Sequence, residues 1–242
     1  MSLTPYWQSP SAQLYLADAR AFLHGEYREH YDMVFADPPF NASKQYGSGL
    51  HDDSMNDVEY LDWLGSWIGE AVRVLKPGGT FWLMNSTRWL GHCQVKLEAA
   101  GLTFVNTIAW VYTNPTPAKN SYPKTWRPII VYSKGKPRVW NSNISLTTGR
   151  PTLYWNPDRA KSSFCHDVWP DIPKLVGGYL APQELLRRPD HSFAHSVQMP
   201  IALAERAILT ATEPGQLILE PFAGSGTVME AALNLGRCVV GI

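Results

Sequence analysis

The chain has 242 residues, 45% of them hydrophobic, and its 21 basic and 21 acidic side chains give a formal net charge of zero. This length supports one large core, or a core with an inserted subdomain. No run of 18 apolar residues occurs and the N-terminus lacks a charged-then-apolar pattern, so we expect neither a membrane span nor a secretion signal. The three cysteines, Cys93, Cys165 and Cys238, fit neither a disulfide framework nor a zinc-ligand spacing. We therefore expect a reduced, intracellular protein without a metal site.

Short apolar strands alternate with helical stretches in both terminal parts of the chain. In chain order, the patterns predict strands at 13–16, 31–36, 80–84 and 104–112, with helices at 19–23, 58–74 and 89–100 between them. After residue 199 the alternation returns, with helices at 200–209 and 226–235 and strands at 216–220 and 238–242. This alternation predicts an α/β fold with a mostly parallel sheet and helices on both faces.

A basic and aromatic segment from Asn114 to Lys161 separates these two parts. It carries nine basic residues and one acidic residue, Asp158, so the charge is unevenly distributed along the chain. Because a structureless stretch of this length is uncommon inside a compact domain, we interpret the segment as an inserted functional region. Basic and aromatic side chains together suit phosphate contacts and base stacking, although an ordinary loop-rich surface would have the same composition.

Two turns combine carboxylates with unusual backbone chemistry. Asp37-Pro38-Pro39-Phe40 follows the predicted strand 31–36, and two consecutive prolines make it a rigid turn, because proline can neither continue a helix nor donate to a central strand. The second turn, Glu220–Thr227, contains two glycines that let the backbone approach a ligand, and its threonine is expected to cap the next helix. Its acid and its lack of a lysine argue against a phosphate loop. They favour a cationic or zwitterionic ligand with a nucleoside part.

In combination, the two turns resemble those of the amino-group DNA methyltransferases that use S-adenosylmethionine, in the permuted subgroup called beta. That family has a (D/N/S)PP(Y/F/W) turn that holds the target base and an FxGxGT loop that binds the methionine part of the cofactor. Here the DPPF turn comes first, the basic segment follows and Phe222–Thr227 comes last, which is the order that defines the subgroup. Further stretches extend the resemblance over essentially the whole chain: Leu16–Ala19, Leu75–Thr80, Tyr132–Lys134 and His195–Arg206.

The resemblance implies a Rossmann-like class I methyltransferase sheet with an inserted target-recognition region. Its parts would be a catalytic half at 1–135, a target-recognition region at 136–190, with the basic stretch beginning near 114, and a cofactor-binding half at 191–242. Glu220 stands where the family usually has Asp. A ribose-binding acid is expected about 20 residues after the first glycine of such a unit. That position falls just beyond Ile242, so we expect the chain to be truncated at its C-terminus.

The implied activity is sequence-specific transfer of a methyl group from S-adenosylmethionine to the N6 amine of a flipped adenine in double-stranded DNA. Asp37 and the Pro38 carbonyl would accept hydrogen bonds from the amine, and Phe40 would stack on the base. An Asp at position 37 favours adenine over cytosine only as a family tendency, so N4-cytosine methylation stays open. So do an RNA or protein-amide substrate and a non-catalytic homologue that binds DNA or cofactor. A second copy of the chain and a cognate restriction endonuclease are further candidate partners of this cytoplasmic, bacterial or phage-encoded protein.

The predicted site residues form three groups. The catalytic group is Asp37, Pro38, Pro39 and Phe40. The cofactor group is Asp18, Ala19, Asp37, His195, Glu220, Pro221, Phe222, Ala223, Gly224, Ser225, Gly226 and Thr227. The DNA-binding group is Tyr46, Lys119, Lys124, Arg127, Lys136, Arg138, Arg150, Arg159 and Lys161. We expect Trp63 and Trp67 to belong to the core, and Asp52 and Asp53 to be solvated loop charges.

Overall fold

The structure is a computed structural model that describes residues 4–42, 53–116, 118–141, 166–175, 184–187, 189–191 and 198–242. The strands of these residues form one nine-stranded sheet in the order β1-β2-β9-β8-β3-β4-β6-β5-β7. Their bounds are β1 Trp7–Ser9, β2 Ala12–Leu14, β3 Tyr31–Ala36, β4 Leu75–Met84, β5 Thr103–Thr116, β6 Lys124–Ser133, β7 Val168–Trp169, β8 Leu217–Glu220 and β9 Cys238–Gly241. The antiparallel neighbours are β1–β2, β4–β6 and β5–β6, and the other pairs are parallel. A mostly parallel α/β sheet is therefore confirmed.

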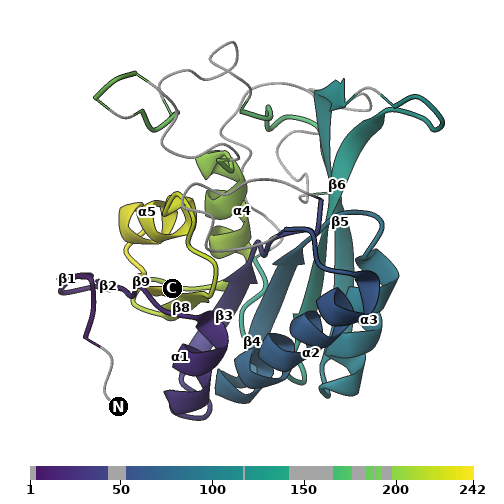
Figure 1. Ribbon diagram of the computed structural model, residues 1–242. Coiled ribbons are helices and arrows are strands. Elements are labelled where there is room, and N and C mark those ends of the chain that lie inside the picture. The colour runs from purple at the N-terminus through teal and green to yellow at the C-terminus, as the bar shows by residue number, and fades with distance from the viewer. Residues whose placement is uncertain are drawn as a thin grey trace, which may run out of the picture.

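Helices cover both faces of this sheet (Figure 1). One face carries α1 Ala19–Gly25, α2 Asp57–Val74 and α3 Leu90–Ala99, and the other carries α4 Ile201–Ala211 and α5 Thr227–Asn234. The longest of them, α2, begins where the Asn56 side chain accepts a hydrogen bond from the Glu59 amide at 3.0 Å, as an N-cap does. Among the described residues, no helix is both long and apolar enough to cross a membrane.

Strand β3 separates the two cores. All six of its residues are buried, and from Met33 to Ala36 they alternate between the faces of the sheet. Met33 and Phe35 pack in the cluster that includes α4 and α5, whereas Val34 and Ala36 pack in the cluster that includes α1, α2 and α3. A continuous apolar run, as the sequence shows here, is what a strand covered on both faces requires.

The direction of the chain connections reverses between β3 and β8, which are neighbours in the sheet. From β3 the chain crosses through α2 to β4 on one side, and from β8 it crosses through α5 to β9 on the other side. The carboxyl ends of β3 and β8 therefore lie at a topological switch point, where open α/β sheets leave a crevice that binds ligands. The Asp37 turn and the glycine turn start at these two strand ends.

We expected the basic segment to be an inserted region, but part of it belongs to the sheet. Lys124–Ser133 forms β6, which pairs antiparallel with both β4 and β5, and β7 adds to β5 at the sheet edge. Pro128 lies in this strand opposite Ala109 of β5, but the pairing of β6 with β4 starts only at Ile129. A proline is tolerated there because its missing amide is not needed by β4. The boundaries of the target-recognition region at 136 and 190 stay predictions.

Candidate active site

A cavity of about 710 Å³ lies at the switch point. Its lining includes Asp37 to Phe40 after β3, Glu220 to Ser225 after β8, and Asp18 with Ala19 at the start of α1. The two turns that the sequence separates by almost the whole chain thus face one space. The cavity therefore brings together a prolyl turn, a glycine turn and four carboxylates, those of Asp18, Asp37, Asp53 and Glu220.

The Asp37 turn is held from behind by two aromatic side chains. The Tyr60 hydroxyl donates to the Pro39 carbonyl at 2.7 Å, and the Trp89 indole N–H donates to the Phe40 carbonyl at 2.9 Å. Among the described residues, none donates a hydrogen bond to the Pro38 carbonyl. The Pro38 carbonyl, which the sequence analysis assigns to the substrate amine, therefore has no hydrogen-bond donor among the described residues.

Asp53 closes the far end of the same turn. It is 3% exposed, and its two carboxylate oxygens accept the backbone N–H groups of Asn41 at 2.7 Å and Ala42 at 3.0 Å. Asn41 has φ of +52°, and its side-chain amide donates to the Met55 carbonyl at 2.8 Å. The prediction that Asp53 is a solvated loop charge is therefore wrong: a buried carboxylate fixes the left-handed residue at which the Asp37 turn ends.

Glu220 is buried at the end of β8, with 4% of its surface exposed. Burial and, next, the negative charge of Asp37 raise the pKa of its carboxyl well above the ordinary value, although the backbone N–H groups of Val228 and Met229 donate to it and oppose the shift. Its Oε2 atom is buried without a hydrogen-bond partner among the described residues. Because a buried carboxylate oxygen is costly to leave unpaired, this atom marks a place for a cationic or N–H donor group.

The glycine turn shapes the backbone beside this carboxylate. Gly224 and Gly226 have φ of +51° and +76°, a region that side chains disfavour, and Gly226 is the N-cap residue of α5. Thr227 was expected to cap the helix, but it is the first helical residue, and its hydroxyl contacts the Met199 carbonyl at 3.3 Å and the Ser225 hydroxyl at 2.9 Å. The backbone N–H groups of Val228 and Met229 in the first turn of α5 lie close enough to the Glu220 carboxyl to lower its pKa.

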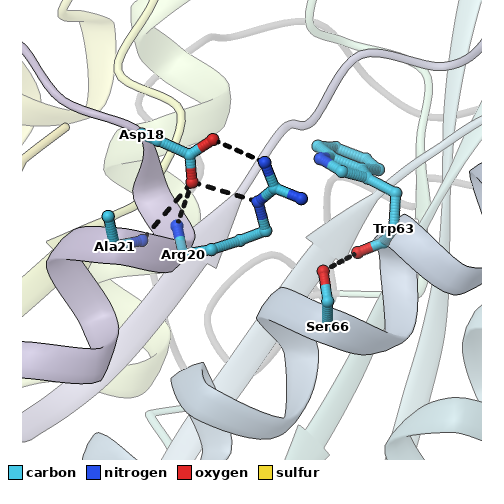
Figure 2. Close-up of polar contacts among 5 residues, drawn as sticks. All are labelled: Asp18, Arg20, Ala21, Trp63 and Ser66. Atoms are coloured by element: carbon cyan, nitrogen blue, oxygen red, sulfur yellow. Dashed lines mark hydrogen bonds and ion pairs between the residues drawn. The ribbon is translucent and has the colours of Figure 1, made fainter.

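At the other end of the cavity, Asp18 is the N-cap of α1. It accepts the Arg20 amide at 2.8 Å and pairs with the Arg20 guanidinium at 2.8 Å, and hydrogen bonds from Arg20 lower the pKa of its carboxyl. Figure 2 shows the guanidinium extending from Asp18 toward the ring of Trp63. The half-buried Trp63 lies 5.6 Å from Phe222, ring centre to ring centre, and both rings line the cavity. An aromatic wall facing an acid suits a nucleoside.

The structure gathers some of the predicted residues and separates others. Among the described members of the cofactor and catalytic groups, only Gly226 is absent from the cavity lining, and it lies in the glycine turn. Arg127 also lines the cavity, while Lys119 and Lys124 are exposed near the tip of the β5–β6 hairpin, which extends past the neighbouring strands (Figure 1). His195, Tyr46, Arg150, Arg159 and Lys161 lie outside the described residues.

Lys136 and Arg138, which were predicted to bind DNA, lie at the ends of the strands opposite to the cavity. Lys136 and Arg138 follow the end of β6, which runs away from the cavity, and Arg138 lies 3.7 Å from Asp32 at the start of β3. Asp32 also pairs with Lys76 at 2.8 Å. This ion-pair cluster joins the strand ends that lie far from the Asp37 turn. We therefore do not include Lys136 and Arg138 among the residues proposed to contact DNA.

Several residues of the site had no signal of their own in the sequence. Tyr60 and Trp89 fall on helix positions whose spacing indicates only a buried face, and Asp53 falls in a polar loop. Trp63 and Trp67 both line the cavity; Trp67 is fully buried, as expected for the core, whereas Trp63 is half-buried. Only the placement of α2 and of the start of α3 beside the Asp37 turn, which no local pattern encodes, reveals these roles.

The fold of the chain is shared with solved DNA methyltransferases. The PvuII DNA methyltransferase, described as cytosine-N4-specific, superposes with a TM-score of 0.73 and 19% identity, over 98% of this chain and 83% of that one. The M1.HpyAVI–SAM complex superposes with a TM-score of 0.61 and 22% identity, over 96% of this chain and 91% of that one. At these identities the likeness shows the shared fold.

Residues 31–242 match the family model described as DNA methylase (N6_N4_Mtase), so the chain belongs to this family of amino-group DNA methyltransferases. It is 32% identical to the type II methyltransferase M.BamHI of Bacillus amyloliquefaciens, over 99% of this chain and 56% of that protein. It is also 29% identical to the DNA adenine methyltransferase YhdJ of Escherichia coli (strain K12), over 93% of this chain and 78% of that protein. The chain thus spans little more than half the length of M.BamHI.

Proposed function

We propose that this chain carries the methyl-transferring site of a sequence-specific DNA methyltransferase, with S-adenosylmethionine as cofactor and the N6 amine of a flipped adenine as acceptor. The observation that carries the proposal is the convergence of Asp37 and Glu220 from adjacent strands into one cavity. One carboxylate lies on the prolyl turn, the other lies beside the glycine turn, and their charges interact.

Asp37 and Pro38 supply the acceptors for the amine. An exocyclic amine is a poor nucleophile because its lone pair is delocalised into the ring. Two hydrogen bonds accepted from its N–H groups, one by the carboxylate and one by the prolyl carbonyl, favour a pyramidal nitrogen. Tyr60 and Trp89 hold the next two carbonyls and so fix the direction of the Pro38 carbonyl. Positioning of this kind supplies much of the rate enhancement in a bimolecular transfer.

Glu220 and the glycine turn fit the cofactor. Bound there, S-adenosylmethionine supplies a sulfonium methyl group next to a cationic amine. The buried Oε2 of Glu220, which has no hydrogen-bond partner among the described residues, fits a cationic donor, and Gly224 and Gly226 leave the adjoining backbone without side chains. Asp18 and the Trp63 ring fit the nucleoside part at the other end of the cavity. The residues present therefore fit this cofactor.

The β5–β6 hairpin is the proposed contact with DNA. It carries Lys119 and Lys124 near its tip. The exposed ring of Tyr122 lies between them in the sequence, and the exposed ring of Trp126 follows Lys124. Cations and aromatic faces together suit phosphate backbone and unstacked bases. Tyr46, His195 and the basic residues from Arg150 to Lys161 stay predicted contacts, as do a second copy of the chain and a cognate endonuclease as partners.

The second candidate is methylation of the N4 amine of cytosine. Cytosine offers the same two N–H groups, so Asp37 and the Pro38 carbonyl accept either amine. Transfer of tritium from labelled S-adenosylmethionine tests both candidates, with duplex DNA, RNA and protein offered in parallel. We expect label in duplex DNA alone, and digestion to nucleosides identifies the base.

Two variants make the assay specific for the site. Asp37→Ala should abolish the label, whereas Asp57→Ala should retain it, because Asp57 is an exposed α2 acid that pairs with Arg88. Equal labelling by the wild type and Asp37→Ala would disprove the catalytic assignment. Label in RNA or protein alone would disprove the DNA substrate.

A further inference from the structure

The guanidinium of Arg127 covers the ring of Phe40. Arg127 lies on β6 opposite Trp110 of β5 and lines the cavity. Its Cζ atom is 4.7 Å from the centre of the Phe40 ring and 6.0 Å from that of Trp110. Phe40 itself is 8% exposed and packs in the core cluster of the sheet. The face that Arg127 covers is therefore the face that a base in the cavity can reach.

No ion pair among the described residues holds Arg127 in this place. Asp37, Asp53 and Glu220 line the same cavity, yet none of the ion pairs among the described residues includes Arg127. Cation–π contact alone favours such a position by about 2- to 30-fold, from exposed to desolvated sites. The guanidinium is thus held weakly enough for a stronger stacking partner to displace it.

A base and this guanidinium cannot stack on Phe40 together. Carbon atoms in contact lie about 3.5–4.0 Å apart, and the guanidinium carbon lies 4.7 Å from the ring centre, so it occupies the first layer above the ring. Base–aromatic stacking is comparable to or stronger than cation–π contact. Exchange of the guanidinium for a base is therefore favourable.

We propose that Arg127 is a placeholder for the target base, an inference that rests on the methyltransferase function proposed above. Without DNA, its guanidinium plane covers Phe40 and keeps water from the ring. When the base enters, it takes this layer and the guanidinium leaves it. Arg127 thereby sets how readily the flipped base is accepted, which is a role separate from a phosphate contact.

Two duplexes that contain the methylated sequence, found by mapping the labelled bases, separate these roles. In one, the target base faces an abasic position, so that its extrusion breaks no base pair; in the other, the target position itself is abasic. Both present the same phosphates, so the ratio of their dissociation constants reports base entry. The measurement uses S-adenosylhomocysteine in place of the methyl donor, which prevents turnover.

We expect Arg127→Ala to increase the preference for the base-containing duplex by about 2- to 30-fold. Arg127→Lys, which keeps the charge but loses the planar group, should shift the ratio in the same direction. Lys124→Ala is the matched control on the same strand: it should weaken both duplexes alike and leave the ratio unchanged. Circular dichroism and the melting temperature establish that each variant is folded.

Each of the remaining outcomes would contradict either the placeholder role of Arg127 or the proposed function. An unchanged ratio in both Arg127 variants would show that the guanidinium does not compete with the base. A reduced ratio would show that Arg127 instead holds the base. A wild type that labels no DNA would overturn the proposed function and the placeholder together, whereas an active wild type with an unchanged ratio overturns the placeholder alone.

Discussion

Glu220→Gln is the substitution that most directly tests the cofactor end of the site. Glutamine has nearly the same shape, and its carbonyl oxygen can still accept from the amides of α5, but it carries no charge for the cationic cofactor. Hydrogen bonds to charged groups contribute about 1.5–3 kcal/mol. We therefore expect the dissociation constant of S-adenosylmethionine, measured by calorimetry at pH 8, to rise about 10- to 100-fold.

The raised pKa of Glu220 adds a dependence on pH. Without ligand, the folded protein keeps this proton at pH values where the unfolded chain, near 4.5, has lost it. The resulting stability is present in full below the unfolded value and is lost as the pH rises through the folded pKa. A cation beside the carboxylate favours its charged form. Cofactor binding should therefore release a proton, and affinity should rise with pH up to the folded pKa.

The same substitution should have the opposite effect on the protein without ligand. Burying the charged form of Glu220, with its Oε2 unpaired among the described residues, is costly, and glutamine avoids this cost at every pH. We expect the unfolding free energy of Glu220→Gln to match or exceed that of the wild type by about 1 kcal/mol, a rise of about 2–4 °C in melting temperature.

Glu230→Gln provides the matched control, because Glu230 is an exposed glutamate on the neighbouring α5. Its affinity for the cofactor should change by about 2-fold or less. Equal affinities of the wild type and Glu220→Gln at pH 8, or a binding heat that does not depend on the ionisation enthalpy of the buffer, would refute the role of this carboxylate.

Three further substitutions test the support of the site. Asp53→Ala removes the acceptor of two amides at the end of the Asp37 turn and should lower kcat about tenfold, with little effect on the KM of the cofactor. Asp57→Ala is the control: Asp57 forms only an exposed ion pair with Arg88, so kcat should stay within about twofold of the wild type. Tyr60→Phe removes the hydrogen bond to the Pro39 carbonyl and should cost about 1 kcal/mol, or about fivefold in kcat/KM; unchanged kinetics would show that the turn is rigid without it. Asp171→Asn leaves the buried guanidinium of Arg206 without its partner and should lower the unfolding free energy in urea by about 3–5 kcal/mol, and a loss below 1 kcal/mol would contradict this expectation.

The sequence predicted those elements whose apolar pattern is local. The strand 31–36 is observed at the predicted residues, and the predicted helix 58–74 differs from α2 by one residue at its start. Both have continuous or helical spacing over their whole length, and the cap and the prolyl turn mark their ends. The prolyl turn and the glycine turn were predicted as site segments from chemistry that only a few residue types provide, and both line the observed cavity.

What the sequence could not predict depends on contacts between distant segments. Strand β6 has exposed residues until Arg127 and a proline at 128, so its first half has no strand pattern, and its place between β4 and β5 follows from pairing. Asp53 is buried only because the left-handed backbone at Asn41 turns two amides toward it. Such contacts are set by the arrangement of the elements in space.

The position of the site also explains why the order of its parts along the chain need not affect its chemistry. The Leu217 amide donates to the Asp32 carboxylate at 3.0 Å across 185 residues, so β3 and β8 begin side by side. They are parallel neighbours and therefore also end side by side, which places the prolyl turn next to the glycine turn whichever strand comes first. Only the connections around the sheet differ between the two orders. The beta-class assignment rests on chain order and stays a prediction, whereas the proposed chemistry depends on the adjacency of β3 and β8.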